Sequence, residues 1–233
     1  MSEFLPLLLS LLLIGTAAAQ PALIKDPGGY CNVRLAASGQ AAVIDRLASG
    51  KIVLVLAKQA EGGWLPIAYQ TGQQAQAGYV HQSRVAFLTG LAPFKPLTRT
   101  ESQLKLQLDG LELTLTKARF SPQGRQIRYG KLPGEAAVVQ TIDRTFPWGT
   151  DGNVPRQQYQ GIQVGTGSSA WHFPVSAFRD VFEPNLELTA AYLDRATGTV
   201  YLEANNSDGA GGYVVVWAVK GRQIIAREVF FPF

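Results

Sequence analysis

The chain has 233 residues, of which 46% are hydrophobic and 16% charged, and its formal net charge at pH 7 is +4. Its single cysteine, Cys31, excludes an intrachain disulfide, so the fold must be held together by apolar cores. Lys and Arg are scattered along the chain rather than clustered, which argues against a nucleic-acid groove.

The first nineteen residues have the pattern of a secretory signal peptide. An apolar run from Leu5 to Ile14 is followed by small residues, and Ala17 and Ala19 occupy the positions that a signal peptidase reads. The run is too short for a membrane helix, which needs about 20 apolar residues, and it lacks the polar face of a core helix. We therefore expect a periplasmic or secreted protein that begins at Gln20 and has no membrane span after cleavage.

Alternating apolar and polar residues predict β-structure for nearly all of the chain after residue 28. Strands are expected at 51–57, 104–116, 186–192, 199–203, 213–219 and 223–231. The last two are rich in apolar residues, as strands covered on both faces are. One short helix is expected at 176–182, capped by Ser176 and stopped by Pro184. These patterns predict an all-β protein: a small barrel followed by a second, mostly antiparallel β domain with one short helix.

A domain boundary is expected at residues 89–102. Pro93 and Pro96 cannot donate ladder hydrogen bonds, and a polar stretch follows them. The predicted organisation is a signal peptide at 1–19, a barrel at 20–88, a linker at 89–102, and a C-terminal β domain of unknown function at 103–233.

Five segments between residues 26 and 86 resemble, in order, the bacterial SH3-like family. The matching segments are Asp26 to Arg34 for the Gly-x-x-Asn-Val-Arg entry, Val43 to Gly50, Lys51 to Leu56, Gly63 to Ile67 for Gly-Trp-x-x-Val, and Gly78 to His81 for the closing Gly-Tyr-Val-His. The chain departs from the family at residues 35–38, where Ser-Gly-Pro is usual, and at Pro66, which suggests an edge strand or a bulge. The resemblance implies an SH3-like barrel that binds cell-wall peptides or other envelope components.

The ligand site on such a barrel is expected on its outside or at its mouth, since the interior is too small. Arg34 would grip a carboxylate, and the aromatic rings of Tyr69 and Tyr79 would form flat platforms. Trp64 would contribute if its ring is exposed, and His81 could face a carboxylate.

Each of these residues also has a structural interpretation. Trp64 would close one end of a small barrel, and His81 would be a hydrogen-bonded structural histidine. Arg34 would pair with a neighbouring acid such as Asp26 or Asp45.

The sequence offers no recognisable catalytic constellation. Cys31 lies in the entry strand rather than at a helix N-terminus, and the two histidines, His81 and His172, fall in different predicted domains. There is no His-Glu-x-x-His run, and residues 167–170 lack the second glycine of a nucleophile elbow. We expect no enzyme, no metal site and no cofactor, although a pair of carboxylates cannot be recognised from sequence.

Three segments of the second half are more particular than generic strands and turns: Trp148 to Gly152, Phe182 to Asn185, and Asn205 to Tyr213. They are similar to a group of small exported bacterial domains of no assigned function. Within them Trp148, Asp151, Asn206 and Asp208 are the residues of interest. A calcium loop and a long hairpin connection are the two interpretations, and the second is favoured because the alternating acidic ligands of calcium loops are missing.

The predicted function is that of a non-catalytic, exported binding protein of the bacterial envelope, which recognises a wall peptide or an envelope protein. The alternative is a periplasmic immunity or inhibitor protein that blocks an enzyme or toxin directed at the envelope. A small hydrolase that uses only carboxylates is the weaker alternative.

Overall fold

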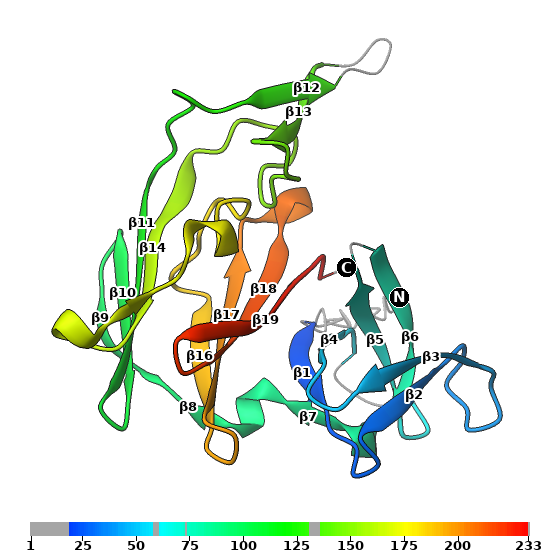
Figure 1. The fold of residues 1–233 in the computed structure, drawn as a ribbon. Coiled ribbons are helices and arrows are strands. Elements are labelled where there is room, and N and C mark those ends of the chain that lie inside the picture. The colour runs from blue at the N-terminus through cyan, green and yellow to red at the C-terminus, as the bar shows by residue number, and fades with distance from the viewer. Residues whose placement is uncertain (1–18, 58–60, 73, 131–135, 233) are drawn as a thin grey trace, which may run out of the picture.

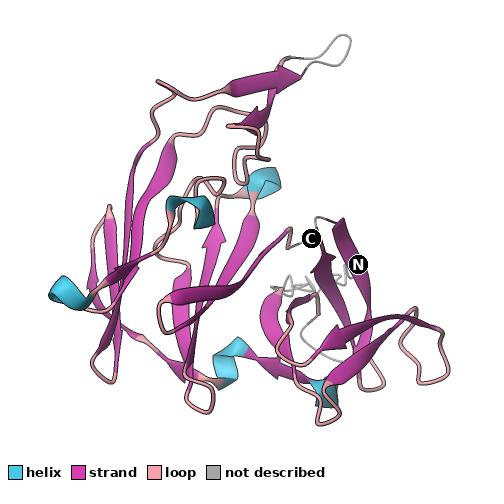
Figure 2. Ribbon diagram, in the orientation of Figure 1, coloured by secondary structure: helices cyan, strands magenta, loops and turns pink. Residues whose placement is uncertain are grey.

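The computed structural model describes residues 19–232 except 58–60, 73 and 131–135 (Figure 1). Residues 1–18 of the expected signal peptide lie outside the described residues, and Gln20 is the first residue of strand β1. The fold is all-β, as the sequence predicts, and every helical segment in Figure 2 is a short 3-10 turn. In the described part of the chain, no helix is long and apolar enough to cross a membrane.

Residues 20–87 form one strongly curled antiparallel sheet, which we call the half-barrel. Its strands follow the order β3-β2-β6-β5-β4-β1-β7. Their bounds are β1 Gln20–Ile24, β2 Tyr30–Arg34, β3 Val43–Ala48, β4 Ile52–Val55, β5 Trp64–Thr71, β6 Gln74–His81 and β7 Val85–Phe87. Alternate residues of these strands point inward and form a core of their own, in which Val33, Ile67 and Val80 are fully buried.

Two further sheets of five strands face each other and bury the largest core between them. The first has the order β15-β14-β11-β10-β9, with β9 Lys95–Arg99, β10 Gln103–Leu108, β11 Leu111–Arg119, β14 Gln157–Val164 and β15 Trp171–His172. The second has the order β19-β18-β17-β16-β8, with β8 Ala92–Pro93, β16 Thr189–Asp194, β17 Thr199–Asn206, β18 Tyr213–Lys220 and β19 Gln223–Phe230. Trp217 lies at the centre of this core and donates its indole N–H to the carbonyl of Ala177.

A separate hairpin extends beyond the two sheets, at the top of Figure 1. It consists of β12 Ile127–Gly130 and β13 Val138–Ile142. A small cluster of Phe120, Val139, Ile142 and Phe182 packs beneath it.

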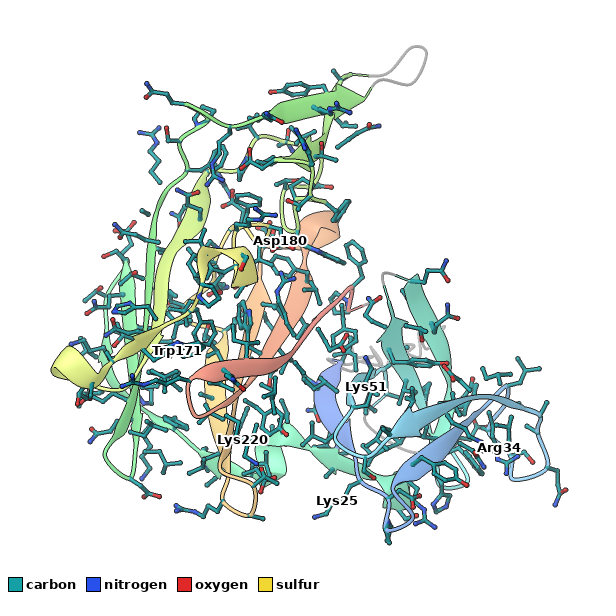
Figure 3. The ribbon with its side chains drawn as sticks, in the orientation of Figure 1. Lys25, Arg34, Lys51, Trp171, Asp180 and Lys220 are labelled. Atoms are coloured by element: carbon teal, nitrogen blue, oxygen red, sulfur yellow. The ribbon has the colours of Figure 1, made fainter. Side chains whose placement is uncertain are left out.

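The half-barrel and the β16–β19 sheet share an apolar seam. Leu23, Ile52 and Leu54 of the half-barrel pack against Val214 and Val216, which point away from the sandwich core. At the edge of the seam the Lys51 ammonium contacts the Glu228 carboxylate at 2.5 Å, and Figure 3 shows Lys51 in this position. The two halves of the chain are therefore joined by buried surface as well as by the chain itself.

Two sequence-based expectations about the elements are wrong. The strand expected at 104–116 is a hairpin, because Asp109 and Gly110 take positive φ and reverse the chain between β10 and β11. The helix expected at 176–182 is a single 3-10 turn, Val175–Ala177. The other expected strands are present, with ends that differ by a few residues.

The stretch assigned to a linker, 89–102, contains two strands of the C-terminal sheets. Pro93 lies in β8 and Pro96 in β9, and both strands are sheet edges. On the outer side of an edge strand there is no neighbouring strand to bond, so a proline, which has no N–H, is tolerated there. Pro66 lies neither at an edge nor at a bulge with β6, since β5 pairs with β6 in unbroken register. It lies beyond the last β4–β5 pair, and its carbonyl accepts from the N–H of Leu56.

Candidate functional site

A pocket of about 490 Å³ opens on the outer face of the half-barrel. It exists because β2 and β6 pair at only one position, Arg34 with Tyr79, so that the rest of β2 diverges from the end of β6. In Figure 1, β2 and β3 run at a steep angle to β5 and β6. The pocket is lined by Asp26, Tyr30, Cys31, Asn32, Arg34, Gly39, Trp64, His81, Ser83 and Arg84.

Strand alternation places the polar and aromatic side chains of this pocket on the outside. Val33 is fully buried, so its neighbours Asn32 and Arg34 share the opposite face, as the sequence predicts. On β5 and β6, Trp64 and His81 form a cross-strand pair on the same outer face.

Arg34 is held in place without being neutralised. Its Nη1 donates to the carbonyl of Ala41 at 2.6 Å, and its guanidinium carbon lies 5.8 Å from the centre of the Trp64 ring. The acidic partners expected from sequence are used elsewhere: Asp26 pairs with Arg84 at 3.3 Å, and Asp45 accepts from the N–H of Arg46. The remaining N–H groups of Arg34 have no acceptor in the described part of the chain, and Figure 3 labels its side chain on the half-barrel.

Trp64 and His81 both line the pocket and contact each other. Their rings meet edge to face with centroids 5.5 Å apart. His81 Nδ1 lies 2.9 Å from Ser83 Oγ and accepts from the Ser83 N–H, so this nitrogen caps the turn that follows β6. The ring also lies against Gly63, where a Cβ would come within 2.7 Å of Nε2 and where φ is +86°. His81 is thus a positioning residue for Trp64, with one ring nitrogen already occupied.

Asn32 lines the pocket and carries an unsatisfied acceptor. Its Oδ1 is buried and has no hydrogen-bond partner among the described residues. An unpaired buried carbonyl costs about 1–3 kcal/mol, so this oxygen favours a ligand that brings an N–H. Nearby, Tyr30 is about half exposed, and the guanidinium of Arg46 lies 5.1 Å from its ring centre.

Tyr69 does not belong to the site. It is 2% exposed and lies inside the half-barrel core, where burial and the neighbouring Asp45 raise its pKa to about 12. The reason is the strand period: Trp64 and Tyr69 are five residues apart on β5 and must face opposite sides of the sheet. Tyr79 does lie on the outer face, beside Arg34, but it does not line the pocket.

In the second half, the three singled-out segments converge on one buried residue, Asn206. Its Nδ2 donates to the hydroxyls of Tyr159 and Tyr213, and its Oδ1 accepts from the N–H of Asn185. The Tyr213 hydroxyl in turn donates to the carbonyl of Phe182 at 2.7 Å. Burial raises the pKa of both tyrosines, which keeps them neutral donors. We call this arrangement the Asn206 network.

The turns around the network are held in left-handed backbone conformations. Asp151, Glu183 and Ser207, one in each segment, have φ between +45° and +60°. The Ser207 hydroxyl donates to the carbonyl of Gly149, where a Cβ would collide with the carbonyl of Phe182 at 2.7 Å. The segments are therefore a packed structural junction, which favours the hairpin interpretation over a calcium loop.

The remaining residues of interest lie at the surface of this junction. Asp151 and Asp208 are exposed, and the turn of Asp208 lies beside Asp151, whose Cβ is 3.3 Å from the Cβ position of Gly211. Among the residues that the structure describes, no three His, Cys, Asp or Glu side chains gather as a metal site would require. Trp148 is half-buried and belongs to an aromatic cluster taken up below.

Cys31 and His172 lie in different parts of the molecule, and neither is placed for nucleophilic chemistry. Cys31 is buried in the half-barrel core, and burial together with Asp26 raises the pKa of its thiol, which disfavours the thiolate. His172 lies exposed on β15, in the sandwich rather than in the half-barrel.

Comparison with protein-family models, with curated proteins and with solved structures finds no significant match for this chain. The candidate site therefore depends on its own geometry.

Proposed function

We propose that this protein is a non-catalytic binding protein that holds a short, extended peptide with a free carboxylate in the half-barrel pocket. The observation that carries the proposal is that Arg34, Trp64 and Asn32 line one opening between β2 and β6, and that the buried Oδ1 of Asn32 has no partner among the described residues.

The three groups complement different parts of such a ligand. The free N–H groups of Arg34 suit a carboxylate, which a planar guanidinium can bind through two parallel hydrogen bonds. Asn32 suits a peptide N–H or an ammonium group, and the Trp64 face suits the backbone or an apolar side chain between them. Asp26 and Arg84 already neutralise each other at the rim.

A cell-wall peptide is the ligand class that fits the wider context. The ordered resemblance of residues 26–86 to the bacterial SH3-like family and the expected signal peptide both support a role in the envelope. Wall peptides are short and extended, carry free carboxylates, and contain D-residues, which separates them from the C-terminal segments of ordinary proteins.

Calorimetric titration with defined peptides tests this proposal. The probes are a stem peptide of alternating L- and D-residues, its carboxamide, and its all-L isomer; pelleting with purified sacculi checks the polymer. We expect the carboxamide and the Arg34→Ala variant each to weaken binding about tenfold or more, because a charge-assisted pair is lost. Arg99→Ala, on the exposed edge strand β9, is the matched control. Equal affinity of wild type and Arg34→Ala would place the site elsewhere.

A second variant, at Asn32, tests binding without destabilising the fold. Asn32→Val replaces an unpaired buried acceptor on a strand by a strand-forming apolar residue, so the melting temperature should stay the same or rise. Peptide affinity should nevertheless fall. A variant that is destabilised but binds normally would show that Asn32 serves the fold alone. If the all-L peptide binds better than the D-containing one, the ligand is a protein segment rather than the cell wall.

A further inference from the structure

A second surface, on the opposite half of the chain, begins at an unusual turn. Asp143 and Arg144 join Ile142 to Thr145, and their φ angles are +50° and +66°. Two successive positive φ angles are the signature of a type I′ turn, whose second position strongly favours glycine. Arg144 therefore occupies a position that its side chain disfavours.

The same chain contains the usual solution at another turn. Between β10 and β11, Asp109 and Gly110 have φ of +50° and +78°, the Asp-Gly pair expected for this turn type. A non-glycine residue in the left-handed region costs on the order of 1 kcal/mol and persists where its surroundings fix it. Here the Asp143 carboxylate fixes the turn by accepting from Arg125 at 2.6 Å and from the Gln126 N–H, and both bonds lower the pKa of Asp143.

Arg144 points to an anion-binding role because a second arginine, Arg179, lines the same pocket. Arg144 and Arg179 line a pocket of about 420 Å³ together with Asp143. Both arginines are exposed, and neither forms an ion pair within the part of the chain that the structure describes. Asp143 is already paired with Arg125, so the two free cations leave the pocket with unbalanced positive charge.

An exposed aromatic cluster adjoins this pocket. Phe146 is 55% and Phe231 44% exposed, and both pack on Trp148, with ring centroids 5.0 and 4.7 Å away. Trp148 lies next to the pocket, since its backbone N–H donates to the carbonyl of Asp180, the residue after Arg179. Figure 3 labels Asp180 in this region, at the end of the sandwich distant from Arg34. We call Arg144, Arg179, Phe146, Trp148 and Phe231 the aromatic–arginine surface.

We propose that the aromatic–arginine surface is a docking site for an acidic segment of a partner protein, one that carries carboxylates beside an aromatic or aliphatic side chain. The charge of the pocket selects carboxylates, and the neighbouring rings select an apolar anchor. Aromatic residues and arginine are the residue types that dominate binding energy in protein interfaces, and exposed apolar clusters of this kind mark interaction sites. Glycine at position 144 would relieve the strain of the turn but would remove one of the two arginines that line the pocket.

Selection from a displayed library of random peptides, followed by fluorescence anisotropy with the selected peptides, tests the proposal. We expect selected sequences to be enriched in Asp or Glu next to Trp, Phe or Leu. Arg144→Gly should weaken their binding about tenfold while the melting temperature is unchanged or higher, because glycine relieves the turn. Phe231→Ser should weaken binding to a similar extent. Binding should also weaken with added salt.

Two controls make the result specific. Arg128→Gln removes an exposed arginine from the neighbouring strand β12 and should leave affinity unchanged. Arg34→Ala should also leave it unchanged, so this proposal and that for the half-barrel pocket succeed or fail separately. The proposal is overturned if no acidic peptides are enriched, if Arg144→Gly binds them as the wild type does, or if anionic lipid vesicles bind at this surface in place of peptides.

Discussion

The half-barrel pocket and the Asn206 network are built in opposite ways. The pocket takes its side chains from regular strands, whose alternation sends Arg34 and Trp64 outward and Val33 inward. The network takes its side chains from β14, β17 and β18, joins them to backbone groups of Phe182 and Asn185 beside turns in left-handed conformations, and buries these side chains completely. The pocket also leaves an acceptor unpaired at Asn32, whereas every polar atom of the Asn206 side chain is bonded.

The difference separates a surface that is prepared for a ligand from one that holds a fold together. Buried polar networks whose members are all satisfied specify one arrangement of the chain and lose stability when any member is removed. An unpaired buried acceptor has the reverse signature, since its removal relieves the fold. The two regions should therefore respond oppositely when an asparagine is replaced, and Asn206 offers the larger effect.

Replacing Asn206 should have the largest effect on stability. Asn206→Ala removes the acceptor of the Asn185 N–H and the donor to Tyr213, and it leaves a cavity beside two buried tyrosines. We expect a loss of about 3–4 kcal/mol in the free energy of unfolding, measured by urea denaturation. Asn153→Ala, an exposed asparagine with one local hydrogen bond, should cost only a few tenths of a kcal/mol. A loss near that of Asn153→Ala would mean that water replaces the network.

The seam between the halves gives the next largest effect. Leu54 is fully buried against the β16–β19 sheet, while Ile67 is fully buried inside the half-barrel. Either residue changed to Ala should cost about 3 kcal/mol through lost burial and a cavity. Because the seam couples the halves, we expect differential scanning calorimetry to record one transition that both variants lower. Two transitions, with Leu54→Ala affecting neither, would show that the halves melt independently and that the seam is weak.

The sequence was sufficient for the all-β fold class and for the outward and inward faces of β2. Alternation and turn residues predict an all-β chain, and the spacing of Asn32, Val33 and Arg34 predicts which of them face outward. The same parity rule places Trp64 and Tyr69 on opposite faces, so the wrong assignment of Tyr69 was avoidable. The Asp-Gly pair at 109–110 likewise marks a hairpin within a stretch that otherwise alternates as one strand.

Other features lie beyond any local pattern. The opening between β2 and β6 depends on a single pairing between residues 45 positions apart in the chain, Arg34 and Tyr79. The lining contributed by Asp26 and Arg84 follows from that opening rather than from their own neighbours. The contact of Trp148 with Phe231 depends in the same way on where the fold brings distant segments together, and nothing in the spacing of these two residues indicates it.

Tyr69 provides a smaller test of the inward and outward faces. Tyr69→Phe should leave peptide binding to the half-barrel unchanged and should cost about 1 kcal/mol or less at pH 7, since it removes one hydroxyl beside Asp45. Its folded-state pKa, about 12, lies above the unfolded value of 10.0, so the wild type loses stability as pH rises past 10. Tyr69→Phe should lose less over that range in thermal melts. Reduced peptide affinity of Tyr69→Phe would show that Tyr69 contributes to the binding site after all.

Replacing Glu203 should have the smallest effect, and it should stabilise the fold. It lies on the β17 face that carries the seam, with one hydrogen bond from Asn205 Nδ2, and burial raises its pKa above the usual value of about 4.5. A raised folded-state pKa means that the folded chain binds the proton more tightly, so folding is penalised as pH rises through the unfolded value and the full penalty applies above the folded one. Glu203→Gln keeps an acceptor for Asn205 but carries no charge. It should therefore raise the melting temperature by about 2 °C at pH 7.5 and make no difference at pH 3.5. The exposed Glu187→Gln is the control and should change neither value. A lower melting temperature at pH 7.5 would mean that the ionised Glu203 carboxylate has stabilising partners within the seam. The seam would then differ from the half-barrel pocket, where the Asn32 acceptor has no partner.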